Sequence, residues 1–339
     1  MNNNPDIRCA TRVGIAFNMK TDPTLQEQAE FDEPETIAAI DHALKAAGFE
    51  TILLEASEDF PQKVYSTNPD IVFNIAEGKS GRNREAQVPA ILEYYNIPYT
   101  GSDAATLSIS LDKALTKQIV EGCGIETPTS FAVKDGVLKA AEDILFPVLI
   151  KPNTEGSSKG ISDTCVAEDL STLQALIDGM MRDYAQDILL ERYIDGREFT
   201  VGLLGNGPDT VVFEPMEIVY QKSRGSYKIY SYEVKKNYKE YISYQCPPDI
   251  SQALKIQMMD AAKTIYETLR CVDFARVDFR LSTDEKLFFI EINPLPGLAP
   301  GYSDYIMLAE YNGITYNALI NEILHSSLKR FGMKAVGKK

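Results

Sequence analysis

Two short segments, FARVDFRL at 274–281 and KLFFIEIN at 286–293, contain the residues best suited to chemistry. Apolar residues alternate with charged residues in both segments, and a short polar stretch separates them. This pattern predicts a β-hairpin with a four-residue turn. In the register that such a turn sets, Arg276 lies opposite Glu291.

Two carboxylates, an amide and a guanidinium then share one face of the hairpin, because side chains two residues apart on a strand point to the same side. These residues are Arg276, Asp278, Glu291 and Asn293. Carboxylate and amide oxygens are hard ligands that suit Mg²⁺, an ion that bridges nucleotide phosphates in phosphoryl-transfer enzymes. The hairpin therefore predicts a magnesium and nucleotide site, with a solvated polar face as the alternative.

Two further segments could contribute to such a site. The segment KPNTEGSSKGIS at 151–162 predicts a strand that leads into a loop of small residues, whose amides can approach phosphate oxygens. It is not a P-loop, because the GxxxxGK[ST] pattern and the following helix are missing. The segment LLERYIDGREF at 189–199 places Glu191 and Glu198 on either side of a chain reversal. Taken singly, both segments are more typical of an ordinary turn and of surface carboxylates.

The spacing of apolar residues indicates how the chain positions these segments. Strand and helix patterns alternate along residues 1–103, which is typical of a doubly wound α/β lobe. Mixed patterns then predict an α+β lobe over 104–195 and another over 196–330, followed by a basic tail at 331–339. The last lobe contains a polar, tyrosine-rich loop at 222–245. A chain of 339 residues is long enough for two or three lobes around a cleft.

Composition and charge disfavour several classes of partner. The net charge of −15 repels nucleic-acid phosphates and anionic lipid surfaces, so neither nucleic acid nor membrane is expected as a partner. We find no signal peptide and no apolar run long enough to span a bilayer, which predicts a cytoplasmic protein. Five cysteines without a CxxC pair predict neither a disulfide framework nor a zinc site.

Five segments in order resemble successive motifs of the D-alanine–D-alanine ligase family, within the ATP-grasp superfamily. They are LDKALTK at 111–117, FPVLIKPNTEGSSKG at 146–160, LLERYIDGREFTVGLLG at 189–205, ARVDFRL at 275–281 and IEINPLPGLAP at 290–300. The resemblance implies an ATP-grasp fold behind a Rossmann-like pre-ATP-grasp lobe, and a homodimer. It also implies a ligase that phosphorylates the carboxylate of one amino acid before the amine of a second attacks it.

The resemblance assigns roles to individual residues, with ATP and two Mg²⁺ ions as cofactors and Mn²⁺ as an alternative metal. Contacts to ATP would come from Lys113, Lys151, Glu155, Ser157, Ser158, Glu191, Arg192, Ile194 and Glu198. Among these, Glu191 would accept from the adenine amino group and Glu198 would hold the ribose hydroxyls. The metal ligands would be Asp278, Glu291 and Asn293. At the reacting atoms would lie the oxyanion-stabilising Arg276 and Gly297, and Lys235 of the mobile loop.

The amino-acid pockets depart from the family pattern. Where the family has His-Gly followed by Gly-Glu-Asp-Gly, this chain has NIAEGKSGRNREAQ at 74–87. Two arginines there, together with Lys236, predict that an acidic corner has become partly basic and prefers a substrate with an additional anionic or strongly hydrogen-bonding group. The candidate substrate contacts are Glu77, Arg82, Arg84, Lys236, Tyr302 and Ser303. The glutamate that takes the first amino group has no clear match, and Asp32, Glu33 or Glu35 could serve.

Three functions remain open at this point. One is a ligase that makes either D-alanyl-D-alanine or another dipeptide of a specialised pathway. The others are a nucleotide-binding regulator that has lost its chemistry and a kinase that stops at the phosphorylated carboxylate. The complete set of metal-binding residues and phosphate-binding lysines favours the ligase.

Overall fold

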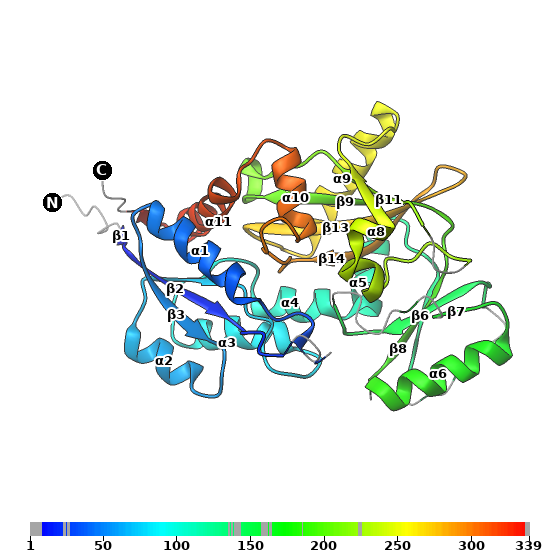
Figure 1. Ribbon diagram of the computed structural model, residues 1–339, viewed down its shortest axis with the longest axis horizontal. Coiled ribbons are helices and arrows are strands. Elements are labelled where there is room, and N and C mark those ends of the chain that lie inside the picture. The colour runs from blue at the N-terminus through cyan, green and yellow to red at the C-terminus, as the bar shows by residue number, and fades with distance from the viewer. Residues whose placement is uncertain are drawn as a thin grey trace.

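The computed structural model describes residues 9–22, 25, 28–134, 136, 138, 144–156, 162, 165–184, 186–222 and 226–335. An α/β lobe lies at one end of the molecule, a large antiparallel sheet in the middle, and a smaller sheet at the other end (Figure 1). None of the helices described combines the length and the hydrophobicity that crossing a bilayer requires.

The N-terminal lobe is built on three parallel strands in the order β3-β2-β4. These are β2 (Arg12–Phe17), β3 (Glu50–Glu55) and β4 (Ile71–Asn74). Helix α1 (Pro34–Ala46) packs on one face, and α2 (Phe60–Thr67) and α3 (Gln87–Tyr94) pack on the other. The doubly wound arrangement is therefore confirmed, and one parallel bridge joins Val72 of β4 to Tyr99.

The C-terminal helix returns to this lobe. Helix α11 (Tyr316–Arg330) shares a hydrophobic core with α1, in which Ile40 and Leu319 are both fully buried. Strand β15 (Lys334–Ala335) pairs in parallel with β1 (Cys9–Ala10), so the first and last described strands meet at one end of the molecule. Residues expected in the C-terminal subdomain thus help to complete the N-terminal lobe.

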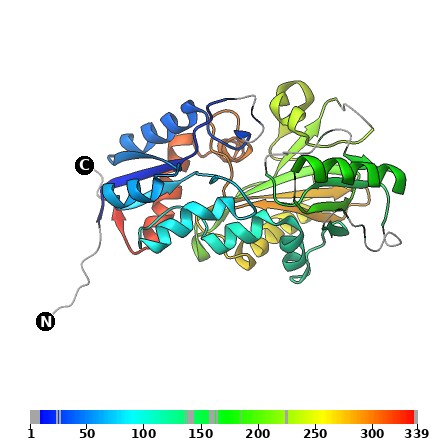
Figure 2. The same ribbon diagram turned by 90° about the horizontal axis from the view of Figure 1, so that it is seen from below.

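Two helices follow the N-terminal lobe. Asp112 has an extended backbone, which ends α4 (Ala104–Leu111), and its carboxylate accepts from Leu115 N at 3.1 Å to cap α5 (Lys113–Glu121). Figure 2 shows these helices, in cyan, running from the N-terminal lobe toward the smaller sheet. The break places Lys113 at the first position of a new helix.

Two antiparallel sheets form the rest of the molecule. The larger has the order β12-β11-β9-β13-β14, with β10 beside β9, and the smaller has the order β5-β8-β6-β7. The larger sheet consists of β9 (Gly196–Leu204), β10 (Val211–Val212), β11 (Met216–Tyr220), β12 (Ile242–Gln245), β13 (Phe274–Ser282) and β14 (Leu287–Asn293). The smaller consists of β5 (Ser130–Val133), β6 (Val148–Pro152), β7 (Val166–Ala167) and β8 (Ile188–Arg192).

Helices cover both faces of the larger sheet, because successive side chains on a strand point to opposite faces. On β13, Ala275 packs toward α9 (Gln252–Thr268), whereas its neighbour Phe274 packs into the core that contains α10 (Asp304–Tyr311). Helix α6 (Leu170–Tyr184) covers the smaller sheet. Each antiparallel sheet is therefore covered by helices on at least one face.

The central hairpin has a different register from the one predicted. Arg276 lies opposite Asn293, and Asp278 lies opposite Glu291. On the turn side of Asp278 the pairing shifts by one residue, which leaves Ile290 as the extra residue of a β-bulge. Without the bulge, Asp278 would lie opposite Ile290, and Glu291 would face away from it. The predicted register was wrong, but the bulge returns the four polar side chains to one face.

The tyrosine-rich segment expected as a loop at 222–245 contains regular structure. It includes α7 (Tyr232–Lys236) and α8 (Tyr238–Tyr241) and ends in β12, which pairs with β11. Ser231 caps α7, and Val234 packs in a small apolar cluster against β11 and β12. The expectation of an irregular loop was therefore wrong. Its mobility stays a prediction.

Asp273 joins three parts of the chain. Its fully buried carboxylate accepts from Gly101 N at 2.9 Å, from Ser327 Oγ at 2.8 Å and from Arg330 Nη2 at 2.8 Å. Asn206 Nδ2 also donates to it at 2.7 Å. Because these donors come from the N-terminal lobe, the large sheet and α11, Asp273 ties these elements together.

We expect Asp273→Ala to lower the free energy of unfolding by about 3 kcal/mol, because it leaves an arginine and several buried donors without an acceptor. Thermal and urea unfolding measure this change. The control is Asp209→Ala, which removes a surface ion pair with Lys329 and should change stability little. Equal unfolding midpoints for Asp273→Ala and the wild type would contradict the role given to this carboxylate.

Candidate functional site

A cavity of about 600 Å³ is lined by residues of all three parts of the molecule. Of the residues expected to contact ATP, it is lined by Lys113, Lys151, Glu191, Arg192, Ile194 and Glu198. The residues expected at the metal and at the reacting atoms all line it: Lys235, Arg276, Asp278, Glu291, Asn293 and Gly297. Of the candidate substrate contacts, it is lined by Glu77, Lys236, Tyr302 and Ser303. Ser157 and Ser158 lie outside the described residues.

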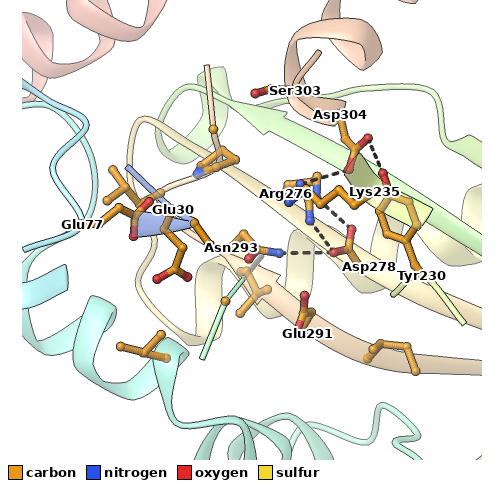
Figure 3. Close-up of a pocket in the computed structure, with 18 of the residues that line it drawn as sticks. Glu30, Glu77, Tyr230, Lys235, Arg276, Asp278, Glu291, Asn293, Ser303 and Asp304 are labelled. Carbon is orange, nitrogen blue, oxygen red and sulfur yellow. Dashed lines mark hydrogen bonds and ion pairs between the residues drawn. The ribbon is translucent and has the colours of Figure 1, made fainter. Parts of the chain in front are cut away.

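The hairpin presents its polar face to this cavity (Figure 3). Arg276 donates to both oxygens of Asp278, at 3.0 and 2.8 Å, and Asn293 Nδ2 donates to Asp278 Oδ2 at 3.2 Å. The amide oxygen of Asn293 is then left for a cation. Burial would raise the pKa of Glu291, but Lys113, Lys151 and Arg276 together lower it to about 2. Glu291 is therefore anionic at neutral pH, as a metal ligand must be.

Glu191 is buried between two lysines at the wall of the cavity that β8 and β6 form. Its oxygens lie 2.7 Å from Lys117 Nζ and 3.1 Å from Lys151 Nζ. Burial opposes ionisation of Glu191, but the two lysines lower its pKa. The group has a net positive charge, which suits phosphate oxygens. Sequence reasoning missed Lys117, although it follows Lys113 by one helical turn and so lies on the same face of α5.

Glu198 is held by a second cation from the hairpin. Arg280 Nη2 donates to it at 3.1 Å, and Tyr220 donates from its hydroxyl at 2.7 Å. Arg280 also donates to the carbonyl of Ile194 at 2.9 Å, which fixes the chain reversal between β8 and β9. Sequence reasoning missed Arg280, although it lies two residues after Asp278 on the same strand.

The two arginines expected to make the substrate corner basic do not line the cavity. Arg82 is 60% exposed and pairs with Asp112 at 2.6 Å. Arg84 is buried, but it donates to Glu30 Oε2 at 2.8 Å and to the carbonyl of Thr154 at 2.6 Å. The expectation of a basic corner was therefore wrong. An arginine in a sequence reveals neither its exposure nor the carboxylate that neutralises it, and Glu30 was missed.

The corner is acidic instead. Glu30, Asp32, Glu77 and Glu85 all line the cavity. Burial raises the pKa of Asp32 and of Glu85 to about 7 and raises that of Glu77 well above its usual value. Repulsion from neighbouring carboxylates adds to each of these increases. Too few cations lie at this end to offset the burial of these carboxyl groups and the repulsion among them.

A glycine turn brings two of these carboxylates together. Gly78 has a φ of +77°, and a Cβ atom there would lie 2.0 Å from the carbonyl oxygen of Arg84. The short helical turn at Arg84–Ala86 can thus fold back against the residue after Glu77. Only glycine allows so close an approach, so NIAEGKSGRNREAQ forms a compact loop rather than an extended one.

Asp304 is a further missed residue, at the opposite end of the cavity (Figure 3). It lies 3.5 Å from Arg276 Nη1 and accepts from the hydroxyls of Tyr244 at 2.7 Å and Tyr230 at 3.3 Å. Lys235 lies nearby, and burial lowers its pKa. The signal that could have found Asp304 is its position directly after Tyr302 and Ser303.

Comparisons with known proteins agree with this arrangement. Residues 123–325 match the family described as D-ala D-ala ligase C-terminus. A D-alanine–D-alanine ligase of Aquifex aeolicus is 32% identical over 84% of this chain and 92% of its own length. The chain belongs to the D-alanine–D-alanine ligase family. Another relative, the uncharacterized protein y4sG of Sinorhizobium fredii, is 33% identical over 85% of this chain and 86% of its own.

The similarity to this family extends over nearly the whole fold of the chain. A crystal structure of a D-alanine–D-alanine ligase from Bacillus anthracis complexed with ATP has a TM-score of 0.72 to this chain, at 22% sequence identity. The alignment covers 95% of this chain and 98% of the other. The ATP-grasp fold implied by the sequence motifs is thereby confirmed.

Glu85 should make stability depend on pH. Its pKa rises from 4.5 to about 7 on folding, so the folded state binds a proton more tightly than the unfolded state. The free energy of unfolding should therefore fall as pH rises from about 4.5 through about 7. We expect the melting temperature to fall less steeply over this range in Glu85→Gln, with Glu58→Gln, a surface change, keeping the wild-type slope. Identical slopes in all three proteins would refute the pKa shift.

Proposed function

We propose that this chain is an ATP-dependent, ADP-forming ligase that joins the carboxylate of one amino acid to the amine of another through an acyl phosphate. The observation that supports this most is that one cavity is lined by both the carboxylate face of the hairpin and the lysines around Glu191. Membership of the family and the name of the Aquifex relative support the same reaction. A cytoplasmic homodimer completes the proposal and rests on the family resemblance.

The nucleotide half fits ATP by charge and by donor type. Lys113 and Lys151 would hold the phosphates, Glu191 would accept from the adenine amino group and Glu198 from the ribose hydroxyls. Glu155 lies beside this half, where its side chain accepts from Gln186 at 2.7 Å. Asp278, Glu291 and the amide oxygen of Asn293 offer the hard oxygens that Mg²⁺ prefers. When bound, the metal would neutralise and align the phosphates.

The reaction needs two displacements in sequence. An oxygen of the first carboxylate attacks the γ-phosphorus of ATP, whose bond to the bridging oxygen breaks and releases ADP. The amine of the second amino acid then attacks the acyl carbon, loses a proton, and phosphate leaves. Lys235 would hold the γ-phosphate, and Arg276 with the backbone N–H of Gly297 would stabilise the oxyanion of the tetrahedral intermediate.

The test of the proposed function is incubation of the protein with ATP, Mg²⁺ and pooled D- and L-amino acids, followed by mass analysis. We expect ADP, phosphate and an amide-linked product in equal amounts. ADP without any amide would indicate a kinase. Binding of ATP without turnover in any pool would indicate a regulator, and either outcome would contradict the ligase.

We expect Glu291→Gln and Asp278→Asn each to leave the fold intact and to lower turnover by orders of magnitude, because each removes a charge that holds the metal against the phosphates. The measurement is the rate of ADP formation as a function of Mg²⁺ concentration, with circular dichroism to check folding. Glu285→Gln, in the exposed turn of the same hairpin, is the matched control and should retain the wild-type rate. Near-normal turnover in both metal-site variants would refute the metal assignment.

A further inference from the structure

The acidic end of the cavity has more carboxylates than cations. Arg84 neutralises Glu30, and on the other side Lys20 lies 3.4 Å from the exposed Glu33. Among the buried and half-buried residues at this end, this leaves the carboxyl groups of Asp32, Glu77 and Glu85, whereas Glu35 is exposed. In Figure 3, Glu30 and Glu77 lie at the opposite end from Arg276 and Lys235, which suit the phosphates. The surplus of carboxyl groups over cations is therefore local to the amino-acid end.

Glu85 is the most informative of these side chains. It is only 9% exposed and lines the cavity, yet it makes no hydrogen bond or ion pair with any residue that the structure describes. Arg84 and Lys113 influence it only at longer range. A carboxylate that is nearly buried and unpartnered is costly, unless a ligand supplies the missing donor.

One ammonium group does not satisfy this set of carboxylates. The α-ammonium of an amino acid can pair with one of these carboxyl groups, which leaves two of the three without a cationic partner. A substrate with a neutral side chain would bury them further. A substrate with a second cationic nitrogen would instead form charge-assisted hydrogen bonds with them.

We propose that the amino-acid end of the cavity binds a basic amino acid, such as lysine, ornithine or arginine, with Glu77 and Glu85 as its specificity-determining residues. This inference rests on the proposed ligase function. It reverses the preference for an anionic substrate that the sequence alone suggested, because Arg82 and Arg84 are occupied by Asp112 and Glu30.

The experiment compares lysine with norleucine, which has the same carbon chain without the terminal amine. Values of kcat/KM are measured from amide formation, with ATP, Mg²⁺ and a fixed pool of partner amino acids, for both D and L forms. We expect lysine to be preferred by at least about tenfold. Glu77→Gln and Glu85→Gln should each bring this preference down toward one, because each removes a carboxylate that would bind the terminal amine. Glu58→Gln, on the surface of the same lobe, should keep the full preference.

A second measurement separates this inference from the ligase function. Isothermal titration of lysine and of norleucine, with a non-hydrolysable ATP analogue and Mg²⁺ present, reports binding without turnover and should show the same preference. Amide formation with norleucine or D-alanine at least as good as with lysine, and unchanged in both variants, would overturn the inference and uphold the ligase. Selective lysine binding without any amide product would refute the ligase instead. Both substitutions preserve the size and shape of the side chain, and a melting curve checks that each variant is folded. The result for either variant alone is enough for the test.

Discussion

Buried charges whose partners come from different lobes determine the geometry of the cavity. Glu191 on β8 is shared by Lys117 of α5 and Lys151 of β6, and Glu291 of β14 lies 3.3 Å from Lys113. Removing one partner of a buried ion pair lowers stability by about 3–5 kcal/mol, because the other charge is left buried and unpaired. The helix α5 and the two sheets must therefore approach one another in an arrangement that satisfies all of these groups. The cavity is the space that this arrangement leaves.

The same charges divide the cavity into two ends of opposite character. Around Glu191 and the hairpin, lysines and arginines exceed what the nearby carboxylates neutralise, and the excess suits phosphates. Around Glu85, carboxylates exceed the cations, and the excess suits an amine. Arg84 joins the two ends, because it pairs with Glu30 and also donates to the carbonyl of Thr154. The loop of the N-terminal lobe that contains Arg84 thus fixes the acidic end of the cavity against the end of β6, which carries Lys151.

Motif order and strand alternation predicted the fold and the polar face of the hairpin. They succeeded because both depend on local spacing, which the sequence contains directly. The register failed because the pairing beside the turn and the bulge at Ile290 each shift it by one residue. The two shifts add to two residues, which keeps the same side chains on one face. The substrate corner failed for a similar reason. Whether Arg84 faces a ligand or a carboxylate depends on where Glu30 lies, 54 residues earlier in the chain.

Transfer of isotope from substrate to phosphate measures acyl-phosphate formation most directly. The amino acid that donates its carboxyl group is labelled with ¹⁸O at both carboxylate oxygens, and the phosphate released with ATP and Mg²⁺ is examined by mass spectrometry. The proposed mechanism predicts one ¹⁸O atom in each phosphate released, because one carboxylate oxygen leaves with the phosphorus when the amine attacks. Amide product formed with no ¹⁸O in the phosphate would contradict activation of the carboxylate by ATP in this cavity.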